Sequence, residues 1–323
     1  MTLKVLVTGG AGYIGCRLVP SLLQEHHQVT VLDTLEYGAD GLLGWLDNPK
    51  LEVVRGSVHP IPDSMRHREF DVILHLAALV GEPACARDRS IAHTVNVDGT
   101  KQVLEEIKSK HFVFFSTCSN YGIVPPDTLA DETTALTPQG LYAETKIKGE
   151  QIVRDRADHL ILRLATICGL SPRMRFDTLV NEVAQRVGLS RPVEFYNVSA
   201  RRPFLHINDL LHFIKLLLIQ YEHQPDMGEQ HNIPRPRTIN LVGENLSKWD
   251  LLHQLIEVAP TTAPVFRIVA QNSDPRDYAV SAEMARRHYL FIPDRTVKDA
   301  MREIIRSVTL LAEPDRPIYR NVA

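Results

Sequence analysis

Short apolar runs alternate with longer amphipathic stretches through the first half of the chain. The apolar runs have the length of buried strands and lie at residues 3–7, 28–33, 51–54, 71–76, 112–116 and 159–165. Between them, residues 13–25, 95–108 and 142–154 carry apolar side chains at the three- and four-residue spacing of a helix. Strands that alternate with helices in this way predict a doubly wound, parallel α/β sheet with helices on both faces.

The pattern loosens after residue 165. Helices are expected at residues 177–187, 209–222, 248–258 and 296–311, and a strand at 193–196. The helix at 209–222 is mostly apolar, so we expect it to return to the first domain and pack there. The predicted division assigns residues 1–165 to the domain of the parallel sheet, with 197–225 returning to it. Residues 166–196 and 226–323 are expected to form a smaller, substrate-binding α/β domain.

The composition narrows the expected partners. The chain has 323 residues, 44% of them hydrophobic, and a formal net charge of −3, which suits a globular protein with a sizeable core. It contains no long basic run and no apolar stretch of membrane-spanning length, so neither nucleic acid nor a membrane is an expected partner. The four cysteines form no C-x-x-C pair, and no signal peptide precedes the first strand. These features predict a reduced, cytoplasmic protein without a metal site.

A glycine-rich turn directly follows the first predicted strand. Gly9, Gly12 and Gly15 have the spacing G-x-x-G-x-x-G and lead into the first predicted helix. A turn of this kind lets a pyrophosphate approach the backbone, where the helix N-terminus offers free N–H groups. Asp33 ends the second predicted strand, where a carboxylate accepts hydrogen bonds from ribose hydroxyls and repels a 2′-phosphate. The chain is therefore predicted to have a Rossmann-type fold that binds NAD in preference to NADP.

Tyr142 and Lys146 are one helical turn apart in the third predicted helix, so they share one face of it. A lysine ammonium beside a phenol favours the phenolate and lowers the pKa of the tyrosine. Such a tyrosine is usable as a general acid or base near neutral pH, which an ordinary tyrosine is not. Because this pair falls in the same predicted domain as the dinucleotide site, it predicts proton transfer beside a nicotinamide.

Taken together, these motifs resemble those of the extended short-chain dehydrogenase/reductase family, in particular its NAD-dependent nucleotide-sugar epimerases and dehydratases. The resemblance covers nearly the whole chain. It is carried by T-G-G-A-G-Y-I-G at 8–15, H-L-A-A at 75–78, Asn96, S-T-C-S-N-Y-G at 116–122, Y-A-E-T-K at 142–146 and R-P-F-L-H-I at 202–207. It implies NAD as the cofactor, a nucleotide-diphosphate sugar as the substrate, and a homodimer formed through the helices predicted at 95–108 and 142–154.

The resemblance also implies a role for each matching residue. Tyr142 would be the acid/base, Lys146 would bind the nicotinamide ribose, and Thr117 would bond the sugar hydroxyl that is oxidised. The implied cofactor-binding residues are Gly9, Gly12, Tyr13, Ile14, Gly15, Asp33, Leu76, Ala77, Ala78, Asn96, Tyr142 and Lys146. The expected substrate-binding residues are Thr117, Ser119, Asn120, Arg173, Arg175, Asn181, Arg202 and Arg276. The arginines suit a diphosphate because a guanidinium makes paired bonds to phosphate oxygens.

The two residues that directly follow Thr117 decide which reaction is expected. The family's 4,6-dehydratases place Asp-Glu there, whereas this chain has Cys118 and Ser119. Ordinary 4,6-dehydration is therefore disfavoured, and the expected activity is epimerisation through a transient 4-keto sugar. The thiol of Cys118 could act in proton transfer, so a 5-epimerase or an unusual dehydratase remains an alternative. A 4-ketoreductase or a decarboxylase, which would use the same scaffold, is a further alternative. A dinucleotide-sensing protein without catalysis is the alternative outside enzymes, and the retained Tyr142 disfavours it.

Overall fold

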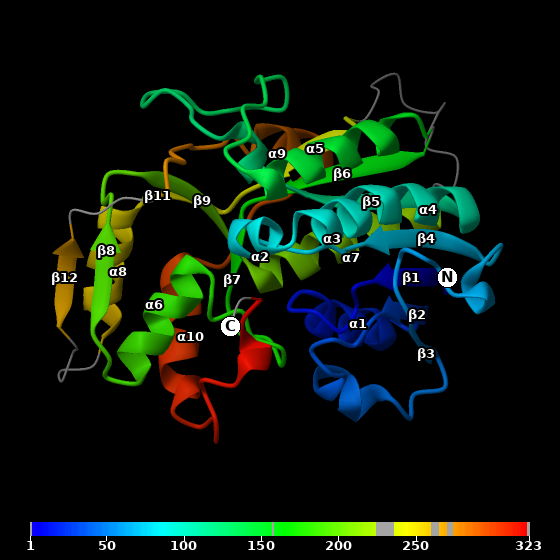
Figure 1. Ribbon diagram of the computed structural model, residues 1–323, viewed down its shortest axis with the longest axis horizontal. Helices are drawn as coiled ribbons and strands as arrows, with labels where there is room; N and C mark the ends of the chain where they lie inside the picture. Colours follow the sequence, from blue (N-terminus) through cyan, green and yellow to red (C-terminus); the bar gives the residue numbers. More distant parts are fainter. Residues whose placement is uncertain (1, 157, 224–235, 260–264, 270–273, 322–323) are drawn as a thin grey trace.

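The computed structural model describes residues 2–156, 158–223, 236–259, 265–269 and 274–321, and within them the largest element is a seven-stranded sheet (Figure 1). All neighbouring strands of this sheet are parallel. Their order is β10 (Thr238–Leu241), β6 (His159–Leu164), β5 (Lys108–Thr117), β4 (Glu69–His75), β1 (Lys4–Thr8), β2 (Gln28–Asp33) and β3 (Leu51–Arg55). The strand order reverses between β1 and β4, which is where sheets of this kind bind ligands. The predicted doubly wound fold is confirmed.

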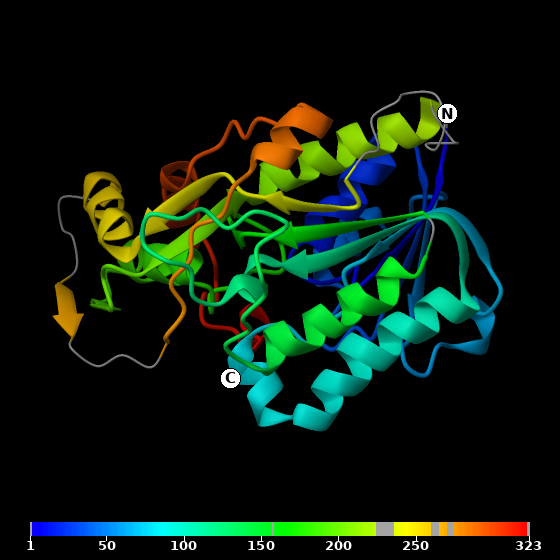
Figure 2. The same cartoon turned by 90° about the horizontal axis from the view of Figure 1, so that it is seen from above.

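Helices cover both faces of the sheet, and alternate residues of its inner strands belong to different hydrophobic clusters. On β1, Val5 and Val7 pack with the helices α1 (Gly15–Gln24) and α7 (Ile207–His223). Leu6, between them, faces the cluster that includes residues of α4 (Gly99–Glu106) and α5 (Leu141–Arg154). Figure 2 shows the cyan and green helices α4 and α5 below the sheet and the yellow-green α7 above it. Among the described residues, no helix combines the length and apolarity needed to cross a bilayer.

Three short helical segments precede α4 on the same side of the sheet. They are α2 (Glu82–Arg87), α3 (Arg89–His93) and a π-helical turn at Thr94–Asp98 that runs into α4. The helix predicted at 95–108 is too long at its C-terminal end, because α4 ends at Glu106 and β5 begins at Lys108. The segment K-S-K-H at 108–111 has no apolar residue to mark it as a strand. Lys108 and Lys110 instead pair with Glu69 and Asp71 of β4, at 3.0 and 2.8 Å.

The remaining elements form a smaller group at one end of the sheet (Figure 1). Its strands are β7 (Thr166–Cys168), β9 (Arg201–His206) and β11 (Glu244–Ser247) in one sheet, and β8 (Val193–Tyr196) paired with β12 (Phe266–Val269). Its helices include α6 (Leu179–Gly188), α8 (Lys248–Val258) and α10 (Val297–Val308), which contact one another, while α9 (Glu283–Tyr289) lies against β10. The hydrophobic pattern does not predict β7, β10, β11 or β12, which have three or four residues each, although it does predict β8, which has four.

Two segments of the second half of the chain join the large sheet. The helix α7 packs against α1, and Arg17 donates to the side chain of Asn208 at 2.7 Å. The strand β10 pairs with β6, although it falls within the range 226–323 that the sequence assigns to the smaller domain. A pattern of apolar residues cannot reveal this crossing, because four residues suffice to add an edge strand. Residues 224–235, which include the end of one predicted segment and the start of the next, lie outside the described residues.

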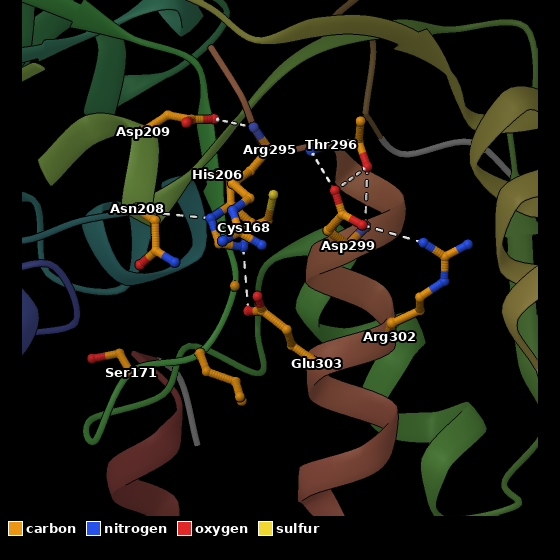
Figure 3. A network of polar contacts seen from close by, with 12 residues as sticks. Cys168, Ser171, His206, Asn208, Asp209, Arg295, Thr296, Asp299, Arg302 and Glu303 are labelled. Carbon is orange, nitrogen blue, oxygen red and sulfur yellow. Dashed lines mark hydrogen bonds and ion pairs between the residues drawn. The ribbon is translucent and has the colours of Figure 1, made fainter. Parts of the chain in front are cut away.

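A polar network ties the smaller group to the sheet where β9 meets α7 (Figure 3). His206 is fully buried, and its Nε2 atom lies 3.2 Å from Oε2 of Glu303 on α10. The carboxylate of Asp209 accepts hydrogen bonds from the backbone N–H groups of Asp294 and Arg295, both at 3.1 Å. These bonds hold the segment before α10 against the start of α7.

Candidate active site

A cavity of about 580 Å³ lies along the carboxyl ends of the strands, between the large sheet and the smaller group of elements. Eleven of the residues singled out in the sequence contribute to its wall. They are Tyr13, Ile14, Leu76, Ala78, Thr117, Ser119, Tyr142, Lys146, Arg175, Arg202 and Arg276. The structure therefore brings together residues from both halves of the chain, at the edge of the sheet where the topology places a ligand site.

The glycine-rich turn closes tightly beside this cavity. Gly9 has a φ of +72°, and a Cβ atom on it would lie 2.8 Å from the backbone nitrogen of Ala77. A Cβ atom on Gly15 would lie 2.4 Å from the carbonyl oxygen of Gly10. Side chains are thus excluded at both positions, because the backbone packs closely where the first strand turns into the N-terminus of α1.

Asp33 lies at the end of β2, against the same turn. Its two carboxylate oxygens accept hydrogen bonds from the N–H groups of Ala11 and Leu35, at 2.9 and 2.8 Å. Burial raises the pKa of this carboxyl, and the two backbone bonds act in the opposite direction. The carboxylate is therefore held beside the glycine turn, as a residue that binds the adenosine ribose has to be.

Asn96 lies behind the cavity wall and connects two of the segments that form it. It is buried, and its side chain accepts a hydrogen bond from the N–H of Leu79 at 2.7 Å and donates to Oγ1 of Thr145 at 2.9 Å. It thereby joins the segment after β4, which contains Ala77 and Ala78, to the helix α5. The structure places Asn96 as a support for the predicted cofactor wall, and it does not line the cavity.

Tyr142 and Lys146 both line the cavity from α5. Lys146 is 2% exposed, its Nζ atom lies 4.1 Å from the centre of the Phe114 ring, and burial lowers the pKa of its amine to about 7. Burial also raises the pKa of Tyr142, and the nearby guanidinium of Arg175 lowers it. Lys146 is not among the groups that shift the pKa of Tyr142, which differs from the sequence-based expectation. The reason is that an amine with a pKa of about 7 has lost its proton at the pH where a phenol ionises, so it carries no charge that would favour the phenolate.

Thr117 and Ser119 face the cavity, whereas Cys118 and Asn120 do not. Oγ1 of Thr117 accepts a hydrogen bond from the N–H of Ser119 at 3.1 Å. The thiol of Cys118 donates to the carbonyl oxygen of Arg163 at 3.2 Å and is almost fully buried, which raises its pKa. Asn120 is also buried, and its side-chain amide donates hydrogen bonds to Oγ of Ser116 at 3.2 Å and to Oε1 of Glu150 at 2.9 Å. The structure thus separates Cys118 and Asn120 from the other predicted site residues.

Two further predicted substrate residues also lie outside the cavity wall. Asn181 donates to the hydroxyl of Tyr13 at 3.1 Å and so joins α6 to the glycine turn. The guanidinium of Arg173 rests 3.9 Å from the centre of the Tyr37 ring. Both residues connect loops around the site, and neither reaches the cavity in this structure.

The end of the cavity formed by the smaller group carries an excess of positive charge among the described residues. Arg202 and Arg276 share the carboxylate of Asp274, at 3.0 and 2.8 Å. Lys248 lines the same end, and its Nζ atom donates to the carbonyl oxygen of Tyr196 at 3.0 Å. Burial and the neighbouring Arg202 lower the pKa of Lys248 to about 8. Three cationic side chains around one carboxylate suit a ligand with two or more negative charges.

Lys248 and Tyr196 line the cavity but are not singled out by the sequence. Glu82 also lines it; the sequence places Glu82 in the loop after the fourth predicted strand, which is expected to face the sugar, without giving it a role. Lys248 stands at the start of a predicted helix, where a lysine is ordinarily a solvent-exposed residue. Glu82 lies in α2, and its contacts are with α5, about 60 positions further along the chain. No local pattern signals contacts of this range, so only the fold could reveal the contacts of Glu82 and the place of Lys248 in the cavity wall.

The model of the NAD dependent epimerase/dehydratase family matches residues 5–241. The chain belongs to this family. It is 32% identical over 180 residues to a UDP-glucose 4-epimerase of Lactobacillus helveticus, covering 52% of this chain and 53% of that protein. It is 30% identical over 249 residues to the low-salt glycan biosynthesis protein Agl12 of Haloferax volcanii, covering 72% of this chain and 76% of that protein. The chain thus spans about half the length of the first of these relatives.

Solved structures of the family share the fold. A UDP-glucuronic acid 4-epimerase from Bacillus cereus, in complex with UDP-glucuronic acid and NAD, matches with a TM-score of 0.79 and 22% identity over 95% of this chain and 99% of that chain. The dTDP-glucose 4,6-dehydratase DesIV from Streptomyces venezuelae matches with a TM-score of 0.80 and 22% identity over 98% of this chain and 99% of that chain. Family membership and fold confirm the predicted resemblance, and the similar structures include both epimerases and dehydratases.

Proposed function

We propose that the protein is an NAD-dependent nucleotide-sugar 4-epimerase. The observation that carries this proposal is the arrangement of one cavity. Tyr142 and Thr117 line it beside the glycine turn, and Arg202, Arg276 and Lys248 line its far end. A sugar bound next to Tyr142 with its diphosphate next to the cationic side chains would span this cavity.

The residues beside β1, β2 and β4 fit NAD. Gly9 and Gly15 leave no room for a side chain in the turn that leads into α1, whose N-terminus would bind the pyrophosphate, and Asp33 is held at the end of β2 for the ribose. Lys146 would bond the nicotinamide ribose, and Leu76 and Ala78 would form the wall beside the ring. Bound NAD supplies the redox chemistry, since it accepts a hydride from a sugar carbon and returns it.

Tyr142 would take the proton of the sugar C4 hydroxyl as the C4–H bond breaks, and give it back when that bond re-forms on the other face. Oγ1 of Thr117 accepts from the N–H of Ser119, so its own hydroxyl proton is free to donate to the sugar oxygen. Lys146, with a pKa of about 7, is placed one turn from Tyr142 and exchanges protons near neutral pH. These groups orient the substrate and move one proton, which is what a 4-epimerase needs from its protein.

The geometry gives Cys118 no part in an elimination. A dehydratase needs a further acid or base beside the sugar ring, and the residue in question, Cys118, directs its thiol at the carbonyl of Arg163 and away from the cavity. Its pKa is raised by burial, which disfavours the thiolate. Ser119, which does face the cavity, is not an acid. The 5-epimerase or dehydratase that would depend on Cys118 therefore has no support from this geometry.

Incubation with UDP-, GDP-, CDP- and dTDP-sugars in deuterated water tests the proposal. We expect interconversion of C4 epimers without carbon-bound deuterium and without net formation of NADH. Deuterium at C5 or loss of water would instead indicate 5-epimerisation or dehydration, and stoichiometric NADH would indicate a dehydrogenase. The variant Tyr142→Phe should lose turnover by about 100-fold or more while it retains NAD, because it lacks the acid/base group. Full activity in this variant would overturn the mechanism.

A further inference from the structure

We infer that Glu82 is a positioning residue, whose carboxylate holds the first turn of α5 and thereby fixes Tyr142 in the cavity. Oε1 of Glu82 accepts a hydrogen bond from the N–H of Leu141 at 2.9 Å, and Oε2 accepts from the N–H of Tyr142 itself at 3.0 Å. The catalytic consequence of this contact rests on the proposed function, while the contact itself does not.

The helix α5 depends on this carboxylate because it has no side-chain cap of its own. Its N-cap residue is Gly140, which offers no side-chain oxygen to the free N–H groups of the first turn. Those groups ordinarily bond a Ser, Thr, Asp or Asn at the N-cap position. Glu82 supplies the missing acceptor from α2, and its negative charge also suits the positive end of the helix dipole.

Gly140 is the second part of the same contact. A Cβ atom at this position would lie 2.2 Å from Oε2 of Glu82 and 2.3 Å from its Cδ atom. The φ of Gly140 is 170°, an extended conformation that any residue adopts, so the backbone does not require glycine. A methyl group at this position would instead displace the Glu82 carboxylate. Glu82 and Gly140 therefore form one unit, which we call the α5 clamp.

The α5 clamp lies where it affects catalysis. Glu82 and Gly140 both line the cavity, together with Val80, Gly81 and Pro83 from the segment before and within α2. A sugar in the cavity would touch the same segment that holds the backbone of Tyr142. Since a misplacement of about 1 Å costs roughly 100-fold in rate, loss of the clamp should act on turnover. Binding of the nucleotide at the far end of the cavity should be little affected.

Hydrogen exchange of the first turn of α5 tests the contact directly, without any substrate. In Glu82→Ala, the amides of Leu141 and Tyr142 should exchange about 10-fold faster or more, because they lose their acceptors. Glu144→Gln is the matched control, since it removes the same charge from an exposed residue of the same helical turn. Unchanged exchange in Glu82→Ala, or equal acceleration in the control, would overturn the clamp.

Kinetics then test the positioning role. Glu82→Ala should lower kcat about 10- to 100-fold with little change in KM or in bound NAD, because the loss is in alignment. Glu82→Gln should lie between Glu82→Ala and the unaltered protein, since its amide keeps one acceptor oxygen. An unchanged kcat in Glu82→Ala would overturn the positioning role. A decrease in kcat that disappears when the rate is divided by the concentration of folded protein would overturn it as well.

The pairing of Glu82 with Gly140 gives an independent criterion. Gly140→Ala alone should lower kcat and speed exchange at Leu141 and Tyr142, because the new methyl group displaces the carboxylate. The same change in the Glu82→Ala background should have no further effect, since no carboxylate remains to be displaced. Losses that multiply would overturn the inference. If no nucleotide sugar is turned over by the unaltered protein, the proposed function fails, whereas the exchange data still decide the clamp.

Discussion

Cys118 shows how the direction of a single side chain decides between two chemistries. Its thiol is bonded to the carbonyl of Arg163 and does not line the cavity. Cys118→Ala should therefore keep turnover close to that of the unaltered protein, whereas loss of a general acid or base costs about 100- to 10,000-fold. Steady-state kinetics with the active nucleotide sugar, normalised to bound NAD, check this. A loss of that size would return Cys118 to the mechanism and favour a 5-epimerase or dehydratase.

Lys146 should make the stability of the protein depend on pH. Its folded-state pKa of about 7 lies below the ordinary value of 10.5, so between these two values the unfolded chain binds more protons than the folded one. The contribution of Lys146 to the free energy of unfolding should accordingly rise as the pH increases from 7 to 10.5. The contribution of this one group should reach a few kcal/mol, since each unit of pKa shift corresponds to about 1.4 kcal/mol.

Urea unfolding of the unaltered protein and of Lys146→Met at several pH values isolates this contribution. Methionine has a similar length and no charge, so the variant should lack the part of the pH-dependent rise that Lys146 causes. Its stability relative to the unaltered protein should be greatest near or below pH 7, where the buried lysine is charged in both states. Parallel pH profiles for the two proteins would show that Lys146 is not buried as described.

At the scale of the elements, the junction of β1 and α1 is set by steric contact rather than by sequence pattern alone. A methyl group on Gly15 would lie 2.4 Å from the carbonyl oxygen of Gly10, so the turn would have to move. Overpacking of this kind costs about 1–3 kcal/mol, which corresponds to roughly 10- to 100-fold in affinity. Gly15→Ala should weaken NAD binding by that factor in calorimetric titration. Gly44→Ala is the control, because nothing lies within 4 Å of its added Cβ atom.

The elements that the sequence predicts well are the strands buried on both faces and the helices that bury one continuous face. The strands β1, β2, β4 and β6 carry apolar residues on both faces, and amphipathic helices such as α1 and α5 cover them, so their periodicity is plain. Of the predicted site residues, Tyr142 on α5 and Thr117 at the end of β5 do meet in one cavity.

The rest of the site could not be predicted because it depends on local turns and distant contacts. Cys118 follows a strand, but residues Cys118–Tyr121 form a 3₁₀ turn, which breaks the alternation and directs the thiol away from the cavity. The direction of this side chain is therefore not readable from the strand period. Glu82 and Lys248 act through contacts that exist only after α2, α5 and α8 have packed.

At the scale of the whole molecule, the outer side of the helical layer suggests how two copies associate. The helices α4 and α5 lie side by side on one face of the sheet. Ile147 of α5 is partly exposed and belongs to neither hydrophobic core cluster of the described residues. Ile91 of α3, in the same layer, is 49% exposed. Apolar side chains on one outer layer suit the predicted homodimer, in which α4 and α5 of two copies form a four-helix bundle.

Light scattering after size-exclusion chromatography should therefore give twice the chain mass of 36.5 kDa. Ile147→Glu should shift the protein to the monomer mass, because it places a charge in the centre of an apolar interface. Leu310→Glu is the matched control, since Leu310 is 82% exposed and lies just after α10, in the smaller group of elements. The control should remain a dimer. A monomer mass for the unaltered protein would contradict the predicted dimer, and a dimer that survives Ile147→Glu would place the interface on a different surface.

Since α5, which carries Tyr142 and Lys146, would form part of the interface, the dimer should also be the form in which α5 is most strongly protected from hydrogen exchange.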